Sequence, residues 1–128
     1  MESTVSIDQF QEELQSWKHE LSSIKQEIRH FEHRLEHMST KNLPKELLAQ
    51  IEHFQNSFIC QKEVLDKLRH DLPDSRHKVE HIFKGLLSHR EEENGMDVHG
   101  ILGDRMDTFR RIYDEVKIDF KKFESEWM

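Results

Sequence analysis

The sequence is short of residues that interrupt helices and of residues that cross-link chains. Its 128 residues include one cysteine, two prolines and four glycines. A lone cysteine cannot form an internal disulfide, which fits a reducing compartment, so we expect a cytoplasmic protein. The scarcity of proline and glycine leaves room for long uninterrupted helices. No run of β-branched residues alternates with a period of two, so strands are not expected.

Long apolar runs and the common catalytic motifs are also missing. No stretch approaches the roughly 20 apolar residues that a transmembrane helix needs. Residues 1–4 carry neither the basic region nor the apolar core of a signal peptide. Phosphate-binding glycine loops and the G-x-S-x-G nucleophile motif are absent. We therefore expect a non-enzymatic protein with no catalytic residues, no cofactor and no membrane partner.

The charge of the chain is mixed rather than basic. Its 19 Lys and Arg residues and 26 Asp and Glu residues are interleaved and give a formal net charge of −7. Nucleic-acid binding normally needs a basic stripe, so no nucleic-acid partner is expected. Ten histidines would move the net charge from −7 to +3 if all were charged. Solution behaviour should therefore change steeply at about pH 6.

The clearest pattern is a heptad seam in the first quarter of the chain. Apolar residues there follow an unbroken alternation of three- and four-residue steps, and every other position is polar or charged. The seam residues are Ile7, Phe10, Leu14, Trp17, Leu21, Ile24, Ile28, Phe31, Leu35 and Met38. This pattern predicts one long helix whose narrow apolar stripe is covered by partner helices.

Three more helices are predicted, separated by proline- and glycine-bearing breaks. The second spans about 44–72, the third about 75–92, and the fourth runs from about residue 104 to the end. Residues 94–103 hold three of the four glycines and are expected to form a loop with a short turn of helix. The sequence thus predicts an all-α fold, an antiparallel bundle of four helices with coiled-coil-like packing in a single domain, 1–128. The first two helices form a long hairpin, which a shorter third and a long fourth helix complete.

Histidines on the first helix raise the question of metal binding. His30, His33 and His37 have spacings of three and four, so two imidazoles could share a zinc or nickel ion. Because Ile28 and Phe31 belong to the seam, these histidines should point outward. We expect no bound metal, and keep as the alternative function a metal-binding or metal-responsive protein that uses His30, His33 and His37.

Three other histidines and the cysteine are expected to be structural or solvent-exposed residues, not parts of a site. His77 and His81 flank Val79 rather than lying on the apolar stripe, so they are expected to face water. His99, close to two glycines, is expected in a loop or at a helix start. Cys60 has no histidine beside it in sequence and is expected to be a half-buried structural thiol.

The candidates for an interaction surface are Ile59, Gln61 and Ile118. Gln61 occupies a seam position, where it either fixes register and partner number or reaches solvent because the bundle splays at that level. Ile59 and Ile118 appear on the exposed faces of their helices. A short third helix should leave apolar surface open, and large open patches usually bind a partner. The leading function is therefore non-enzymatic protein–protein interaction or a structural role, with a protein partner or a micromolar homodimer.

Overall fold

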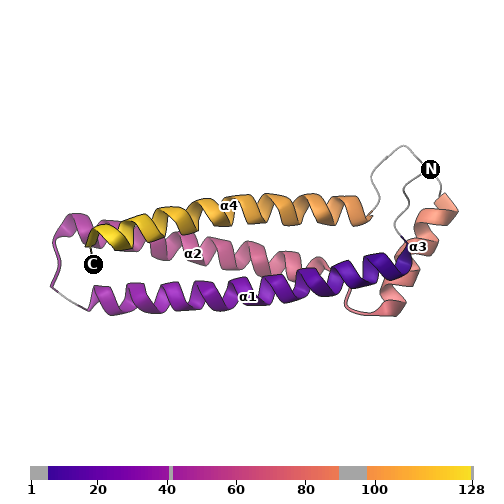
Figure 1. The fold of residues 1–128 in the computed structure, drawn as a ribbon, viewed down its shortest axis with the longest axis horizontal. Coiled ribbons are helices and arrows are strands. Elements are labelled where there is room, and N and C mark those ends of the chain that lie inside the picture. Colours follow the sequence, from indigo (N-terminus) through magenta and orange to yellow (C-terminus); the bar gives the residue numbers. More distant parts are fainter. Residues whose placement is uncertain (1–5, 41, 90–97, 128) are drawn as a thin grey trace.

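The computed structural model describes residues 6–40, 42–89 and 98–127, and within these ranges the chain is helical without strands. The helices are α1 (Ile7–Ser39), α2 (Lys45–Asp71), α3 (Arg76–His89) and α4 (Val98–Trp127). Contacts between them join α1 to α2, α2 to α4, and α1 to α3. The predicted all-α helical bundle is therefore confirmed (Figure 1).

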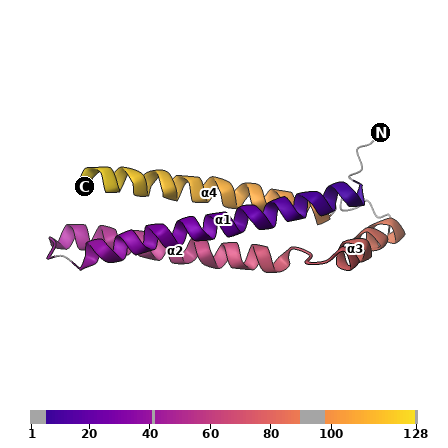
Figure 2. The ribbon, with the colours of Figure 1, turned by 60° about the horizontal axis from the view of Figure 1, so that its bottom comes forward.

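The three long helices lie side by side over most of their length, as two views show (Figures 1 and 2). Helix α2 runs antiparallel to α1, and α4 runs antiparallel to α2, so α1 and α4 are parallel. The short helix α3 lies at one end, beside the start of α1. The bundle thus consists of three helices over most of its length, and α3 extends one end instead of covering the side of the long helices.

The limits of α1 follow from its capping residues. Ser6 Oγ accepts a hydrogen bond from the Gln9 backbone N–H, and the Gln9 side chain accepts one from the Ser6 N–H, each at 3.1 Å. This capping box satisfies two of the backbone donors that a helix start leaves free. Thr40 ends the helix, and Pro44 then precedes the first turn of α2. The predicted seam from Ile7 to Met38 and the predicted second helix over about 44–72 agree closely with these limits.

The start of α4 corrects the sequence prediction. Glycines suggested a loop up to residue 103, whereas α4 already begins at Val98. Leu102 is buried there and continues the apolar seam. A Cβ added at Gly103 would lie 3.8 Å from the Trp17 ring, which is ordinary contact distance. Gly103 lies within α4, and the space beside it would accept an alanine, which has the higher helix propensity.

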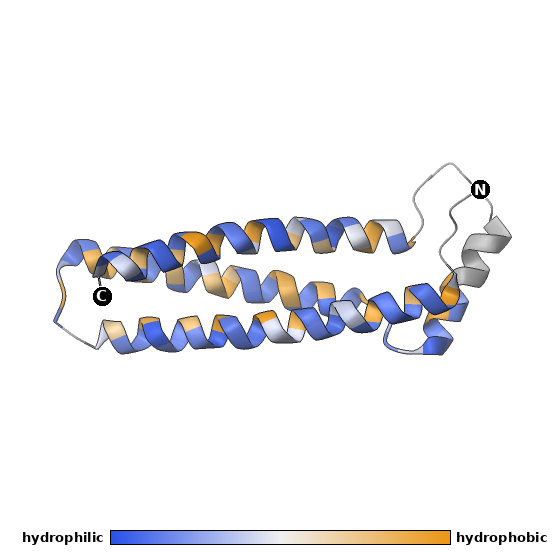
Figure 3. Cartoon of the chain, in the orientation of Figure 1, coloured by the Kyte–Doolittle hydropathy of each residue, from blue (hydrophilic) through white to orange (hydrophobic). Residues whose placement is uncertain are grey.

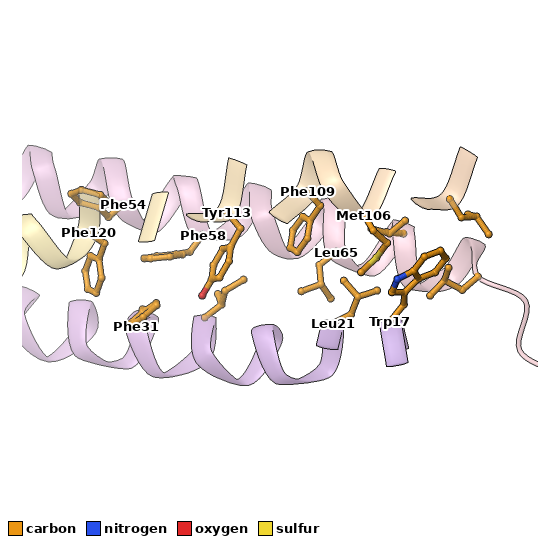
Figure 4. Packing of buried hydrophobic residues seen from close by; sticks show 14 of the residues in the cluster. Trp17, Leu21, Phe31, Phe54, Phe58, Leu65, Met106, Phe109, Tyr113 and Phe120 are labelled. Atoms are coloured by element: carbon orange, nitrogen blue, oxygen red, sulfur yellow. The ribbon is translucent and has the colours of Figure 1, made fainter. Parts of the chain in front are cut away.

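Apolar residues of the three seams meet along the axis of the bundle (Figures 3 and 4). Around Phe120, the ring of Phe31 lies 5.0 Å away and that of Phe58 lies 5.3 Å away, between centroids. Aromatic pairs at such distances add about 0.5–1.5 kcal/mol beyond their area burial. The predicted seam of α1 is confirmed, since seven of its members are buried and Ile7, Ile24 and Met38 pack partly buried against the core.

The buried apolar residues of α2 run from Leu47 to Leu68 and those of α4 from Leu102 to Phe123, whereas Trp127 at the end of α4 is 47% exposed. In α3, Val79 is buried. The described part of the structure does not include the side chains of Phe83, Leu86 and Leu87 or the predicted end of this helix near Glu92. Within the described ranges, no helix has the length and apolar character of a membrane span.

Candidate functional site

Side chains along the α1–α4 joint form what we call the polar ladder. On α1 its members are spaced by seven residues. Glu13 contacts His99, Glu20 contacts Arg110, Glu27 contacts Tyr113 and Lys117, and Arg34 contacts Glu124. Because the two helices are parallel, every partner lies 86 or 90 residues further along the chain. The heptad spacing keeps the ladder on one side of α1.

The inner rungs of the polar ladder are well-formed ion pairs. Arg110 donates two hydrogen bonds of 2.7 Å to the Glu20 carboxylate, and this pairing raises the pKa of Arg110. Burial raises the pKa of Glu27, but hydrogen bonds donated by Tyr113 and Lys117 outweigh it and bring the pKa below its usual value. Such two-point pairing restricts geometry as well as adding energy. The α1–α4 joint is therefore closed by charged side chains.

The α1–α2 joint is closed in a similar way over part of its length. Lys25 Nζ lies 2.7 Å from Asp66 Oδ1, and Lys62 Nζ lies 3.0 Å from Glu32 Oε1. Towards the α1–α2 turn, this joint widens into a hollow of about 530 Å³. Its lining is Arg29, Glu32, His33, Glu36, Glu52, Gln55, Asn56 and Ile59. Seven of these eight residues are polar or charged, so the hollow offers little apolar surface.

The α2–α4 joint differs from the other two. Among the described residues it has one ion pair, in which Arg105 lies 3.0 Å from Asp71 Oδ2. Beside this pair lies a hollow of about 310 Å³ that we call the α2–α4 groove. Its lining is Gln61, Val64 and Leu68 of α2 with Asp104, Arg105, Thr108, Phe109 and Ile112 of α4. The groove therefore places apolar side chains where the other joints carry rows of charge.

Two aliphatic side chains flank this groove and are open to solvent. Val64 is 50% exposed and Ile112 is 37% exposed, and they stand on opposite helices. Ile101 is 45% exposed and precedes the groove residues Arg105 and Thr108 at helical steps of four and three. Val64 and Ile112 are therefore the exposed aliphatic side chains of the groove lining, and Ile101 lies one helical turn before it.

Gln61 lies in the α2–α4 groove and answers the question left open by its seam position. The residue is only 8% exposed, yet its side chain makes no hydrogen bond with any described residue. Its amide atoms are also absent from the fully buried polar atoms that lack a partner. The amide therefore meets solvent through the groove, as expected if the helices splay at this level.

The three predicted interaction residues are not brought together. Gln61 lines the α2–α4 groove, whereas Ile59, 46% exposed, lines the polar hollow between α1 and α2. Ile118 is 66% exposed and belongs to neither hollow. Sequence reasoning missed Ile112 as a groove residue. The available signal was an isoleucine off the seam of α4 that could pair with Val64, off the seam of α2.

The histidines of α1 lie where the helical phase predicted. His30, His33 and His37 are all exposed, and the His33 ring lies 3.9 Å from the Glu36 carboxylate. Over the part of the chain that the structure describes, no three histidine, cysteine or acidic residues are placed to share an ion. The ligand set His30, His33 and His37 thus gains no further ligand from a neighbouring helix.

His99 lies in the first turn of α4, as expected for a helix-start residue, but it is also part of the core edge. Its ring stacks on Trp17 with centroids 5.7 Å apart and meets Phe10 edge-on at 5.2 Å. Its Nε2 contacts the carboxylate of Glu13. His77 and His81 are exposed as predicted. The role of His99 is therefore to attach the start of α4 to α1.

The environment of Cys60 corrects the sequence interpretation. The thiol was expected to be half-buried, but Cys60 is exposed. It directly precedes Gln61 and lies one helical turn before Val64, both of which line the α2–α4 groove. Cys60 therefore offers a unique chemical handle beside this groove.

No protein-family model, curated protein or solved structure matches this chain.

Proposed function

We propose that this chain is a non-enzymatic protein-interaction module that binds a helical segment of a protein through the α2–α4 groove. The observation that carries the proposal is the contrast between the joints. Charged rows close the α1–α4 joint and much of the α1–α2 joint, while the α2–α4 joint presents Val64, Ile112 and the Gln61 amide to solvent.

The geometry of helix packing supports a helical ligand. Two antiparallel helices with an open apolar joint can accept a further helix in the groove between them, as in four-helix bundles. Full burial of an aliphatic side chain such as Val64 or Ile112 contributes about 1.5–3 kcal/mol, and less where it is already half-covered. Polar groups at the rim, such as Thr108 and Gln61, would then gain hydrogen-bond partners.

The cellular setting we propose is the cytoplasm, where a reducing environment would keep the exposed Cys60 as a free thiol. The chemistry of the groove fits this role better than catalysis. Its lining offers one carboxylate and one guanidinium, Asp104 and Arg105. Of these, Arg105 is paired with Asp71.

A photo-crosslinker attached to Cys60 tests the proposal. Benzophenone maleimide would label this single cysteine beside the groove, and irradiation in an extract of the source cells should give a covalent adduct with a protein. Val64→Glu should abolish the adduct, because a carboxylate would have to be desolvated in the interface. The matched control, Ile118→Glu, should leave it unchanged. An adduct that survives Val64→Glu, or no adduct at all, would contradict the proposal.

A further inference from the structure

Three residues of α4 next to the groove repeat at intervals of seven and differ in character. They are Arg105, Ile112 and Asp119, a cation, an apolar residue and a carboxylate. Heptad spacing places them on one face of the helix. Arg105 and Ile112 line the α2–α4 groove, and Asp119 is exposed and makes no ion pair with any described residue. This face of α4 therefore carries a cation at one end, which is paired with Asp71 of α2, an apolar residue in the middle and a carboxylate at the other end.

The facing side of α2 repeats at the same interval. Asp71 and Val64 are seven residues apart, and Asp71 contacts Arg105 at 3.0 Å. Since α2 and α4 are antiparallel, Val64 then lies level with Ile112, and both line the groove. The apolar centre of the face thus includes one exposed aliphatic residue from each helix.

We infer that the helical partner is a second copy of this chain, packed with the two α4 helices antiparallel about a two-fold axis beside Ile112. This inference rests on the proposed function of the α2–α4 groove. In this arrangement, Arg105 of each copy faces Asp119 of the other, because both lie one heptad from the axis. The arrangement gives the unpaired Asp119 carboxylate a partner and buries Ile112 and Val64 of both copies.

The charge pattern selects this arrangement against its neighbours. Parallel packing of the two α4 helices would place Arg105 against Arg105 and Asp119 against Asp119. An antiparallel packing slipped by one heptad would place Ile112 against a charged residue. Like charges that face each other, or a charge buried without a partner, destabilise these alternative geometries. Charged residues in an interface therefore contribute more to the choice of geometry than to affinity.

The size of the face sets the expected affinity. From residue 101 to residue 119 it runs for about 27 Å, at 1.5 Å per residue, and two helices are about 20 Å wide. Each copy would therefore cover roughly 500 Å², below the roughly 800 Å² per partner of a stable standard interface. We expect a reversible dimer with a dissociation constant in the micromolar range.

Sedimentation equilibrium of the intact chain, over a hundredfold concentration range centred in the micromolar region, tests the inference. The average mass should rise from 15.5 kDa toward twice that value. Ile112→Glu should raise the dissociation constant about a hundredfold or more, because each interface would receive two carboxylates at its centre. Asp119→Arg should raise it about tenfold by facing cation with cation. Ile118→Glu, on the same helix but outside the groove, should change nothing.

Each other outcome overturns the inference in a distinguishable way. A constant mass of 15.5 kDa would exclude the second copy, and groove-dependent crosslinking of a foreign protein to Cys60 would then leave the proposed function standing. A dimer that tolerates Ile112→Glu but is broken by Ile118→Glu would move the interface to another face. Circular dichroism melting of each variant identifies any that fail to fold. For those, the test is a spin label attached to Cys60 of the unmutated chain. The label should give one intermolecular distance distribution, and the absence of any intermolecular distance would contradict the dimer.

Discussion

The Tyr113 hydroxyl donates a hydrogen bond of 2.5 Å to Glu27 Oε1, and Lys117 donates one of 2.9 Å to the other oxygen of the same carboxylate. Tyr113 is 2% exposed as a residue, while the Glu27 side chain is 35% exposed. Figure 4 shows the Tyr113 ring among the core residues with its hydroxyl toward α1. A core tyrosine thus has its polar end satisfied by a carboxylate on the adjacent parallel helix. This contact joins the apolar core to the polar ladder and makes the stability of the bundle dependent on pH.

Replacement of Glu27 should weaken the acid dependence of stability. Folding lowers the pKa of Glu27 from its ordinary 4.5. Its carboxylate therefore stabilises the fold above that pH, and this contribution is lost as the pH falls through the folded value. Between about pH 5 and pH 3, the melting temperature of Glu27→Gln should fall less than that of the unmutated chain. The control Glu36→Gln, at a side chain 77% exposed, should retain the full dependence.

Replacement of Tyr113 should act at the alkaline end. Burial, and then the hydrogen bond to Glu27, raise the pKa of Tyr113 above its ordinary value of 10.0. The protonated phenol therefore stabilises the fold below about pH 10, and this stabilisation is lost as the pH rises and the unfolded chain ionises. Tyr113→Phe should lose about 1–2 kcal/mol at pH 7 with the hydrogen bond. In urea titrations at rising pH, its stability should then decline less steeply, and an equal decline would contradict the prediction.

Buried and exposed positions of the bundle should respond very differently to truncation. Trp17→Ala and Phe109→Ala should each destabilise the fold by about 3–5 kcal/mol, because both side chains are buried. His33→Ala, at a side chain 81% exposed, should change stability by no more than about 0.5 kcal/mol. Urea unfolding monitored by circular dichroism measures all three. A large loss at His33 together with tolerance at Trp17 would place the helical phase of α1 in error.

The α1 helix could be predicted from the sequence because its limits and buried face depend on local chemistry. Ser6 and Gln9 form the capping box within four residues, and the heptad seam needs no knowledge of its partners to show which side is buried. The start of α4 could not be predicted in this way. Gly100 and Gly103 disfavour a helix locally, whereas the contact that holds the first turn of α4, the stacking of His99 on Trp17, joins residues more than eighty positions apart.

The candidate site was less predictable for a related reason. Glu13, Glu20, Glu27 and Arg34 already show heptad spacing in the sequence, but their partners follow only from the parallel packing of α1 and α4. The α2–α4 groove is defined by what that packing leaves uncovered. The exposure of Ile59 and Ile118 could be predicted because it follows from the residue pattern of a single helix. The groove could not, because its position depends on how two helices pack.

Metal binding to α1 can be tested directly. His30, His33 and His37 are exposed and have no further ligand from another helix within the described residues. Zinc prefers four ligands in fixed tetrahedral positions, so calorimetric titration should show only weak binding without defined stoichiometry. His33→Ala should leave that weak signal almost unchanged. Tight one-to-one binding that disappears in His33→Ala would instead support the metal-binding alternative.

The polar ladder reverses sign at its last rung, and this reversal favours the observed register of α4 on α1. Three rungs carry a carboxylate on α1, at Glu13, Glu20 and Glu27, whereas the fourth carries Arg34. If α4 slipped by one heptad in one direction, Arg34 would meet Lys117. If it slipped in the other direction, Glu27 would meet Glu124. Either slip places like charges together, which is how coiled coils specify alignment.

Arg34→Glu should therefore destabilise the bundle. The double variant Arg34→Glu, Glu124→Arg should recover stability but should no longer hold α4 in a single register. The Glu124 side chain is 8% exposed, and a second carboxylate beside it should cost about 2–3 kcal/mol in urea unfolding. Adding Glu124→Arg restores an ion pair at this rung and should return most of that loss. The same exchange removes the penalty on slipping, so exchange broadening or doubled peaks are expected for α4 amides in NMR spectra. A double variant with single sharp α4 peaks would show that core packing alone sets the register.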